Sequence, residues 1–396
     1  MNHNSIYMEA ALPQQNARIH SIDILRGVIM VIMALDHVRD FYSNAPFDPL
    51  DLSKTTVFYF FTRWITHFCA PAFVFLSGTS AFLSLSKKKT KKEASLFMLS
   101  RGLWLLFLEL TVIGFGWQVT GVFNNILAQV IWAIGWSMII LSVLVYLKPV
   151  YVGLFGLILI FGHNAFDYVR SDSWGHYKFF WMFLHEQNFY QITPHESIFI
   201  LYPIIPWVGV MAAGYAFGTL FKQAPDKRRA LFIKIGLGSI ALFLILRGFN
   251  IYGDPFPWDH QAVWWKNILA VIRVQKYPPS LDYLLITLGI SITALGLLEK
   301  TDNRVSRFFV VFGRVPLFYY ILHIYLVHGS QIIGALASGI TKEQLAKQSP
   351  GVPGPFGFSL PVVYLVWIAV IIILYFPCRW YMKYKLSHKR WWLSYL

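Results

Sequence analysis

Charged residues are scarce in this sequence. Asp, Glu, Lys and Arg make up only 13% of its 396 residues, whereas 56% are apolar and the mean hydropathy is +0.52. A water-soluble domain carries about 25% charged residues, because its surface must be hydrated. This composition therefore excludes a soluble globular fold and indicates a protein whose main solvent is lipid.

Cysteine is also scarce. The two cysteines, Cys69 and Cys378, lie within or at the end of apolar runs, which excludes a disulfide framework. The sequence also lacks a Gly-rich phosphate loop, a closely spaced set of metal ligands, a low-complexity tract and an internal repeat. Residues 1–17 are polar and lack the basic start, the apolar core and the cleavage site of a removable signal peptide. We expect one membrane domain without a metal, targeted to the membrane by its first apolar run.

Ten apolar runs of about 18 to 25 residues recur along the chain, and each is long enough to cross a hydrocarbon core of roughly 30 Å as a helix. Hydrocarbon does not tolerate unpaired backbone groups, so the predicted fold is an all-α, polytopic integral membrane protein. An eleventh crossing at 262–275 would reverse the topology after it, and an interfacial or re-entrant segment is the alternative. The ten predicted spans are Ile22–Phe41, Val57–Leu85, Ser95–Trp117, Asn125–Leu147, Val150–Phe166, Ser197–Phe221, Ala230–Phe249, Leu281–Leu298, Phe308–Gly329 and Leu360–Phe376.

Basic residues gather in four short segments between or after these runs. The formal net charge is +15, but its confinement to loops favours membrane orientation over nucleic-acid binding. By the positive-inside rule, all four segments and both termini are cytoplasmic, and the protein lies in the cytoplasmic (inner) membrane. We expect a cytoplasmic segment at 1–20, a single transmembrane domain at 21–380 and a basic cytoplasmic tail at 381–396. The four segments contain Lys87, Lys88, Lys89, Lys91 and Lys92; Lys222, Lys227, Arg228 and Arg229; Arg304 and Arg307; and Lys383, Lys385, Lys389 and Arg390.

The first apolar run carries ionisable residues at both ends, which is costly in a membrane helix and indicates either function or a partner. At about 100° per residue, Asp23, Arg26 and His37 share one helix face, and about 16 Å separates Arg26 from His37 along the axis. A pantetheine arm has a similar length. A thioester donor could therefore hold its phosphates at Arg26 and present its acyl group at His37. The alternative is an Asp23–Arg26 ion pair at the interface and a histidine that caps the outer end.

Other predicted spans repeat this layering when depth is counted from the cytoplasmic end. Arg101 and Arg314 fall roughly 9 Å deep, where guanidinium groups suit phosphate. Glu109 and His323 fall roughly 21 to 22 Å deep, near His37, and His67 lies further out. An imidazole in this outer layer suits a general base. The alternatives are snorkelling for the arginines, hydrogen bonding between helices for His323, and a bond from His67 to a carbonyl freed by the following proline.

Two predicted loops add candidate binding residues. Lys276 precedes the eighth span and could contact an anionic group, with a plain interfacial turn as the alternative. Asp254 and Trp258 lie in an aromatic, acidic loop on the outer side. Their ring and carboxylate could hold a sugar, whereas the alternative is a belt of interfacial tryptophans.

Several motifs resemble those of a known family. The stretch at 18–27, Arg-Ile-His-Ser-Ile-Asp-Ile-Leu-Arg-Gly, is followed after ten intervening residues by His37. It resembles the first helix of the transmembrane acyltransferases, the acyltransferase-3-like superfamily. Four further segments, at 73–81, 206–209, 276–281 and 313–323, resemble the bacterial relatives of heparan-α-glucosaminide N-acetyltransferase, and the similarity spans nearly the whole chain.

The resemblance implies acetyl-CoA as donor, an amino-sugar or other saccharide acceptor, and transfer across the membrane. The family's catalytic histidine stretch corresponds here to 44–47, Asn-Ala-Pro-Phe, which has no histidine, so His37 is the predicted base. The predicted catalytic residues are His37, Asp36, Asp40 and His67. The predicted donor-binding residues are Asp23, Arg26, Arg101, Lys276, Arg314 and His323. The predicted acceptor-binding residues are Arg39, Asn44, Asp254 and Trp258.

We therefore predict an acetyl-CoA-dependent sugar N-acetyltransferase, with O-acyl transfer, a covalent acyl-histidine intermediate and a homo-oligomer left open. Its expected partners are a saccharide acceptor and the lipid bilayer, without nucleic acid. One alternative is a transporter or flippase for a sugar or lipid-linked sugar, in which buried carboxylates and histidines relay protons. Another is a binding or assembly subunit that shows no turnover.

Overall fold

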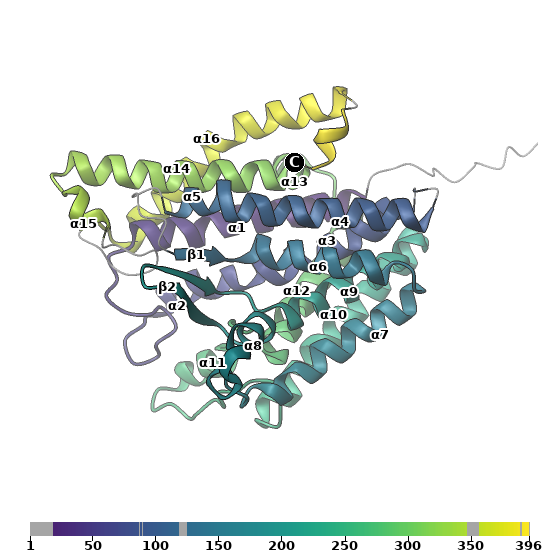
Figure 1. The fold of residues 1–396 in the computed structure, drawn as a ribbon, viewed down its shortest axis with the longest axis horizontal. Coiled ribbons are helices and arrows are strands. Elements are labelled where there is room, and N and C mark those ends of the chain that lie inside the picture. Colours follow the sequence, from purple (N-terminus) through teal and green to yellow (C-terminus); the bar gives the residue numbers. More distant parts are fainter. Residues whose placement is uncertain are drawn as a thin grey trace, which may run out of the picture.

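The computed structural model describes residues 19–86, 88, 90–118, 125–346, 356–388 and 390–395. Segment 1–17 and the basic residues Lys87, Lys89 and Lys389 lie outside the described residues. The described chain is mostly helical, and its long helices run in broadly the same direction through one bundle (Figure 1). The α-helices are α1 (His20–Tyr42), α2 (Val57–Trp64), α3 (Cys69–Leu85), α4 (Lys91–Leu108), α5 (Gly114–Trp117), α6 (Val130–Leu144), α7 (Pro149–Gly162), α8 (Lys178–Leu184), α9 (Ile204–Phe217), α10 (Pro225–Gly248), α11 (Trp264–Ile272), α12 (Leu281–Leu297), α13 (Arg304–Arg314), α14 (Pro316–Ala337), α15 (Lys342–Ala346) and α16 (Leu360–Ser387).

Short helical segments of other types extend several of these helices. A π-helix, η2 (Glu109–Ile113), joins α4 to α5, so that 91–117 is one continuous helix. The 3₁₀ segments are η1 (Ile65–Phe68), η3 (His163–Phe166), η4 (Ser171–Tyr177), η5 (Gly218–Lys222), η6 (Leu298–Lys300) and η7 (Trp391–Ser394).

A small three-stranded sheet lies at one end of the bundle (Figure 1). Its strands are β1 (Asn125–Ala128), β2 (Asn188–Thr193) and β3 (Glu196–Ile200), in the order β1-β3-β2. β1 runs parallel to β3, and β2 pairs with β3 as an antiparallel hairpin. The all-α expectation therefore needs a correction, because the predicted spans at 125–147 and 197–221 begin as strands. Short apolar runs do not distinguish a strand from a helix by periodicity.

Eight described helices are long and apolar enough to cross a membrane. α1 has 23 residues, about 34 Å of helix, but carries five charged residues near its two ends, Asp23, Arg26, Asp36, Arg39 and Asp40. α6 is apolar but has only 15 residues. The protein is thus a multi-pass membrane protein. The eight membrane-length segments are Val57–Leu85, Lys91–Trp117, Pro149–Phe166, Ile204–Lys222, Pro225–Gly248, Leu281–Lys300, Pro316–Ala337 and Leu360–Ser387.

The ninth predicted span, 308–329, is not one helix. α13 ends at Arg314, and Val315, with φ −132° and ψ 49°, separates it from α14, which begins at Pro316. Proline has no N–H and disfavours the helical conformation of the residue before it. Arg314 therefore lies at a helix junction rather than inside a continuous span. The doubtful segment 262–275 holds α11, whose nine residues extend only about 13 Å and cannot cross the bilayer.

Helix starts follow local sequence signals. The Thr90 hydroxyl accepts a hydrogen bond from a first-turn N–H of α4, and the Ser280 hydroxyl does the same for α12. Asn303 and Ser306 form a capping box at the start of α13. Each cap satisfies N–H groups that have no partner within the helix.

α1 lies at the centre of the bundle, in contact with α3, α13, α14 and α16. A Cβ on Gly27 of α1 would lie 1.9 Å from the Phe309 carbonyl oxygen of α13. A Cβ on Gly313 of α13 would lie 1.8 Å from the Asp23 carbonyl oxygen of α1. Only glycine permits this close crossing. The crossing brings Arg314, at the end of α13, beside Asp23.

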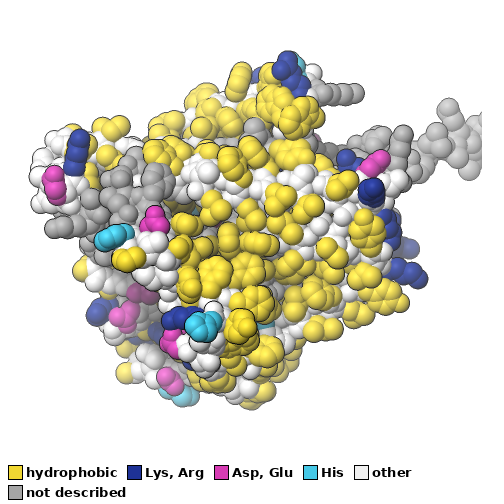
Figure 2. Space-filling view, viewed as in Figure 1, with side chains coloured by type: hydrophobic (Ala, Val, Ile, Leu, Met, Phe, Trp, Pro, Cys, Tyr) yellow, Lys and Arg dark blue, Asp and Glu magenta, His cyan; other side chains and the backbone are white. Residues whose placement is uncertain are grey.

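The outer surface is suited to lipid contact. Figure 2 shows hydrophobic side chains across the broad middle of the visible face, with one group of Lys and Arg at its right-hand edge and others, near Asp, Glu and His, at the left and lower left. Large apolar side chains such as Val143, Ile158 and Ile333 are about 70% exposed, which hydrocarbon stabilises and water does not. A basic edge beside an apolar belt is typical of a membrane–water interface.

Candidate active site

A cavity of about 890 Å³ lies at the end of the bundle that carries His37. Its walls come from α1, from η1 and the start of α3, from the three strands and from the loop before α12. Aromatic side chains line much of it, including Phe189 and Phe199 of the β2–β3 hairpin. The charged or imidazole-bearing side chains in the lining are Asp36, His37, Arg39, Asp40, Asp48, Arg63, Lys276 and His328.

Asp36 is the centre of an ion cluster in this cavity. Arg63 Nη1 donates to both carboxylate oxygens of Asp36 at 2.7 Å. Arg39 Nη2 lies 2.8 Å from Asp36 Oδ1, and Lys276 Nζ lies 3.8 Å from Oδ2. Arg39 also donates to Asp40 at 2.6 Å. Three cations thus face two carboxylates, which leaves one positive charge in the cluster and leaves Asp36 fully engaged.

His37 lies beside this cluster and faces a second histidine. His37 Nδ1 is 2.6 Å from His323 Nε2, and the two rings stack with their centroids 4.9 Å apart. His323 Nδ1 lies 3.2 Å from the carbonyl oxygen of Tyr319. A carbonyl only accepts, so this bond assigns the hydrogen of His323 to Nδ1 and makes its Nε2 an acceptor. His37 Nδ1 then donates to His323, and His37 Nε2 is the basic nitrogen.

Aromatic rings hold His37 in place. Trp117, at the end of α5, packs edge-on against the His37 ring at 4.9 Å between centroids, and Tyr320 of α14 does so at 6.2 Å. Both aromatic side chains line the cavity. Packing and the hydrogen bond to His323 together fix the orientation of His37.

At the opposite end of α1, arginines gather around Asp23. Arg26 Nη2 donates to Ser80 Oγ at 2.7 Å, and Arg26 Nη1 lies 3.8 Å from Asp23 Oδ1. Arg314 Nε lies 3.3 Å from Asp23 Oδ2. Arg101 is close enough to Arg26 to interact with it electrostatically. Arg26 and Arg314 beside the Asp23 carboxylate, with Arg101 near Arg26, leave a surplus of positive charge, which suits phosphate oxygens.

The face of α1 between these two clusters carries Met30 and Met33. They are only 2% and 4% exposed, so their side chains fill the space along this face. Met33 also lines the cavity. An unbranched thioether side chain repacks easily, so these two residues can make room for a slender ligand arm.

His67, a predicted catalytic residue, and Asn44, a predicted acceptor contact, lie away from the cavity lining. His67 is 1% exposed and packs against Tyr283, with 5.5 Å between ring centroids. Within the described part of the chain, its ring nitrogens have no hydrogen-bond partner. Asn44 is exposed, and its backbone N–H donates to the Phe358 carbonyl at 3.1 Å. Neither residue is among those that line the cavity.

Asp254 and Trp258, the predicted sugar contacts, stabilise their own loop. Asp254 Oδ2 accepts from the Gln275 N–H at 2.7 Å and from the Ser280 hydroxyl at 2.8 Å. Asp254 Oδ1 lies 3.7 Å from Arg247, and Trp258 Nε1 donates to the Arg247 carbonyl at 2.9 Å. Because these polar groups already have partners, the loop is held in shape, and neither predicted residue lines the cavity.

The family model for heparan-alpha-glucosaminide N-acetyltransferase, catalytic, matches residues 18–251, more than half of the 396-residue chain. The chain belongs to this family. The assignment supports a transmembrane acetyltransferase-type function. No individual curated protein matches the chain. The matched segment contains Arg26, His37 and Arg63, whereas Lys276 and His323 lie beyond it.

Three side chains of the cavity that contact Asp36 or His37 were not predicted from the sequence: Arg63, Trp117 and Tyr320. Arg63 carried a usable signal, because it is a charged residue inside the predicted span at 57–85. Trp117 and Tyr320 carried none, since aromatic residues are common in spans and only the fold places these two rings against His37.

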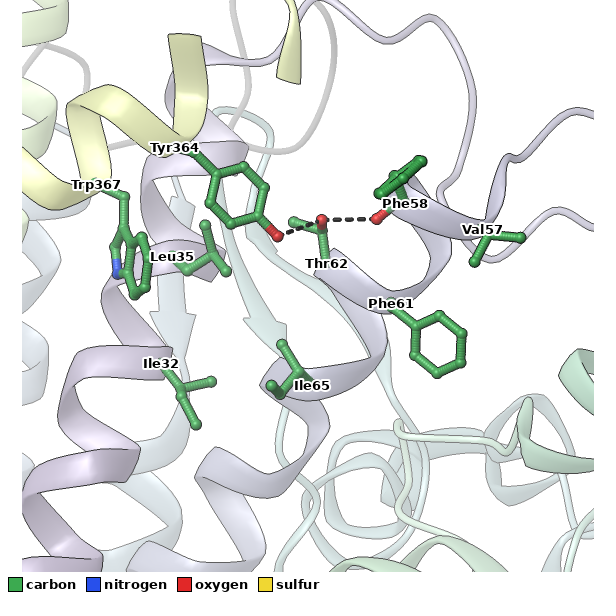
Figure 3. A pocket seen from close by; sticks show the side chains of 9 residues that line it. All are labelled: Ile32, Leu35, Val57, Phe58, Phe61, Thr62, Ile65, Tyr364 and Trp367. Carbon is green, nitrogen blue, oxygen red and sulfur yellow. Dashed lines mark hydrogen bonds between the residues drawn. The ribbon is translucent and has the colours of Figure 1, made fainter. Parts of the chain in front are cut away.

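A second hollow, of about 410 Å³, lies between α1, α2 and α16 (Figure 3). The Thr62 hydroxyl donates to the Phe58 carbonyl at 2.7 Å and bonds to the Tyr364 hydroxyl at 2.9 Å. The other lining side chains are apolar apart from the indole N–H of Trp367, which donates to the Val31 carbonyl. Because no described residue of its lining is a carboxylate, an imidazole or a cation, this hollow does not suggest acid–base chemistry.

Proposed function

We propose that the protein transfers an acetyl group from acetyl-CoA to an amine or hydroxyl of a saccharide bound in the 890 Å³ cavity. The observation that carries this proposal is the hydrogen bond between His37, which lines the cavity, and His323, which is buried behind it. It leaves His37 Nε2 as a base beside the space that an acceptor would fill. Membership of the acetyltransferase family supports the reaction class.

The arginine cluster at Arg26 is the proposed phosphate site. Arg26, Arg101 and Arg314 would bind the phosphates of CoA, and the pantetheine arm would follow the face of α1 past Met30 and Met33. The length of this face, about 16 Å, matches the arm, so the thioester would lie near His37. The basic loops predict that the Arg26 end faces the cytoplasm of a cell with an inner membrane, so the acceptor would enter from the outer side.

In the proposed reaction, the acceptor nitrogen or oxygen attacks the thioester carbonyl carbon. His37 Nε2 takes the proton that the acceptor loses, and the new imidazolium keeps its Nδ1–H bond to His323. The carbon–sulfur bond of the tetrahedral intermediate then breaks. The thiolate of CoA leaves with the electron pair and accepts the proton from His37, so the imidazole returns to its neutral form.

The ion cluster around Asp36 would stabilise the oxyanion of that intermediate. Its single surplus positive charge lies beside His37, on Arg39, Arg63 and Lys276. Fixed charges of this kind act strongly where water is largely displaced by ligand. Asp36 would hold the three cations in position, which makes it a positioning residue rather than a base.

The aromatic walls would bind the acceptor. Phe47, Phe189, Phe199, Tyr202 and Tyr277 all line the cavity. Ring faces pack against the apolar faces of a sugar, while the charged cluster hydrogen-bonds its hydroxyls. A mostly apolar pocket with a few convergent polar groups is the usual form of a small-molecule site.

The test is release of free thiol from acetyl-CoA in the presence of glucosamine, measured on purified protein in lipid nanodiscs. His37→Ala should lower kcat about 10²- to 10⁴-fold, the usual contribution of a general base, without loss of acetyl-CoA binding. His260→Ala, which removes an exposed histidine of an outer loop, should leave kcat unchanged. Wild-type rates in His37→Ala would refute the assignment, and saccharide uptake without thiol release would indicate a transporter.

A further inference from the structure

Three side chains of metal-ligand type converge outside the active-site cavity. The ligand atoms of His163, Asp167 and His185 all lie within 4.8 Å of one another. His163 Nδ1 is 3.3 Å from His185 Nε2, which is 3.8 Å from Asp167 Oδ1. Ligand atoms around a tetrahedral zinc ion, with bonds of 2.0 to 2.2 Å, lie about 3.4 Å apart. The two measured edges therefore match the spacing of a metal site.

Hydrogen bonds alone do not satisfy this arrangement. A carboxylate oxygen has no hydrogen, and each neutral imidazole carries one. If His163 Nδ1 donates to His185 Nε2, then His185 Nε2 carries no hydrogen and Asp167 Oδ1 faces a nitrogen that cannot donate to it. When His185 Nε2 is the donor, its single hydrogen must serve two acceptors. A cation at the centre would accept all three lone pairs at once.

The residues around this group orient the three side chains, as the residues around metal ligands do. His163 and His185 are 1% and 2% exposed. The second oxygen of Asp167, Oδ2, accepts from the Asn164 amide at 2.7 Å, which fixes the carboxylate. The side-chain oxygen of Asn164, Oδ1, in turn accepts from the Leu281 N–H of α12 at 2.8 Å. Three elements are thereby connected at one point: the end of α7, the end of α8 and the start of α12.

Aromatic rings cover one side of the group. Trp181 and Phe166 lie with their ring centroids 5.6 and 6.3 Å from that of His185. Asp167 is the least buried of the three, so a water that completes the coordination would bind on its side. Zinc accepts this combination of two imidazoles, one carboxylate and one water.

We infer that His163, Asp167 and His185 bind a divalent first-row transition cation, with Zn²⁺ as the ion best suited to the geometry. None of the three residues lines the active-site cavity, so the ion is structural. His185 ends α8 just before β2, the strand that carries Phe189 into the cavity wall. The ion would fix this strand against the end of α7. Intervals of 3 and 17 residues between the ligands explain why the sequence spacing gave no indication of the site.

The test is metal content by mass spectrometry, measured on full-length protein produced without a polyhistidine tag and dialysed against zinc-containing and then zinc-free buffer. We expect close to one Zn²⁺ per chain. The isosteric Asp167→Asn should retain less than a tenth of that amount. The control, His176→Ala, removes an exposed histidine from the same loop and should retain all of it.

Two further measurements, each with a wild-type arm, keep the inference testable if Asp167→Asn fails to fold. Zn²⁺ added to chelator-treated wild-type protein should raise Tm by at least about 2 °C, but should not do so in Asp167→Asn. Co²⁺ should produce the visible absorption of tetrahedral coordination in the wild type alone. Absence of bound metal and of any Tm change in the wild type would overturn the inference. So would equal zinc retention by Asp167→Asn.

Discussion

The hydrogen bond from His37 to His323 makes a quantitative prediction. His323→Ala removes His323 Nε2, which lies 2.6 Å from His37 Nδ1 and accepts its hydrogen. Without this acceptor, both tautomers of His37 become accessible. A hydrogen bond to a charged group, such as the imidazolium formed during transfer, contributes about 1.5–3 kcal/mol. At 1.36 kcal/mol per tenfold change, kcat should fall about 10- to 150-fold.

The control is His323→Gln. Its amide oxygen can accept from His37 Nδ1 at nearly the position of Nε2, so we expect it to recover most of the rate lost in His323→Ala. The assay is thiol release at saturating acetyl-CoA and glucosamine, together with Tm and acetyl-CoA affinity for each variant. If His323 had only a structural role, His323→Ala would lower Tm, and kcat would not fall in His323→Ala and recover in His323→Gln. Wild-type kcat in a folded His323→Ala protein would refute the reasoning.

Three further substitutions probe the remaining parts of the site. Asp36→Asn leaves the cations of its cluster without their shared carboxylate and should lower the free energy of unfolding by about 2–3 kcal/mol. This is less than the full cost of breaking a buried ion pair, because the cavity is partly open. Denaturant unfolding measures the loss, and Asp172→Asn, at an exposed position, is the control that should show none. Gly313→Ala places a Cβ 1.8 Å from a backbone oxygen of α1 and should cost about 1–3 kcal/mol and weaken acetyl-CoA binding. Gly329→Ala should do neither when both are compared by thermal unfolding and calorimetry, because its Cβ would meet no described atom within 4 Å apart from its chain neighbours and its own helix backbone. Arg26→Ala should weaken acetyl-CoA binding about 10- to 150-fold with the acceptor KM unchanged, and unchanged CoA affinity would remove Arg26 from the phosphate site.

Much of the helical framework follows from the sequence, because apolar runs of membrane length have few alternatives in lipid. The relative positions of the ionisable residues along α1 were also predictable from the sequence. A regular helix fixes the angles and the rise between Asp23, Arg26 and His37 once its start and end are known. The depth count also placed His37 and His323 in one layer, and the two side chains are in contact in the structure.

Other features depend on packing that no local pattern encodes. The 125–128 and 196–200 segments are apolar enough for a span, but they pair with each other as strands across a gap of about seventy residues. The junction at Val315 lies within an apolar run, where only Pro316 indicated a break. Predicted depth could not reveal that Lys276 enters the His37 cavity rather than the arginine cluster, since its position is set by the loop before α12.

Two of the predicted acceptor residues show that residue chemistry alone does not identify a binding site. Asp254 and Trp258 have the chemistry of a sugar site, yet their polar groups are used by Arg247 of α10 and by Gln275 and Ser280 of the segment before α12. A sequence shows that a carboxylate and an indole are present. Whether their hydrogen-bonding capacity remains available depends on which backbone groups the fold brings to them.

Transfer of a labelled acetyl group across a sealed membrane tests the central claim most directly. Proteoliposomes would carry glucosamine inside and isotope-labelled acetyl-CoA outside, and the lumenal sugar would be analysed by mass spectrometry. The wild-type protein should produce labelled N-acetylglucosamine inside vesicles that exclude CoA, and His37→Ala should produce none above the level of protein-free vesicles. Labelled product at equal rates in both proteins, or free acetyl-CoA within the lumen, would contradict the account.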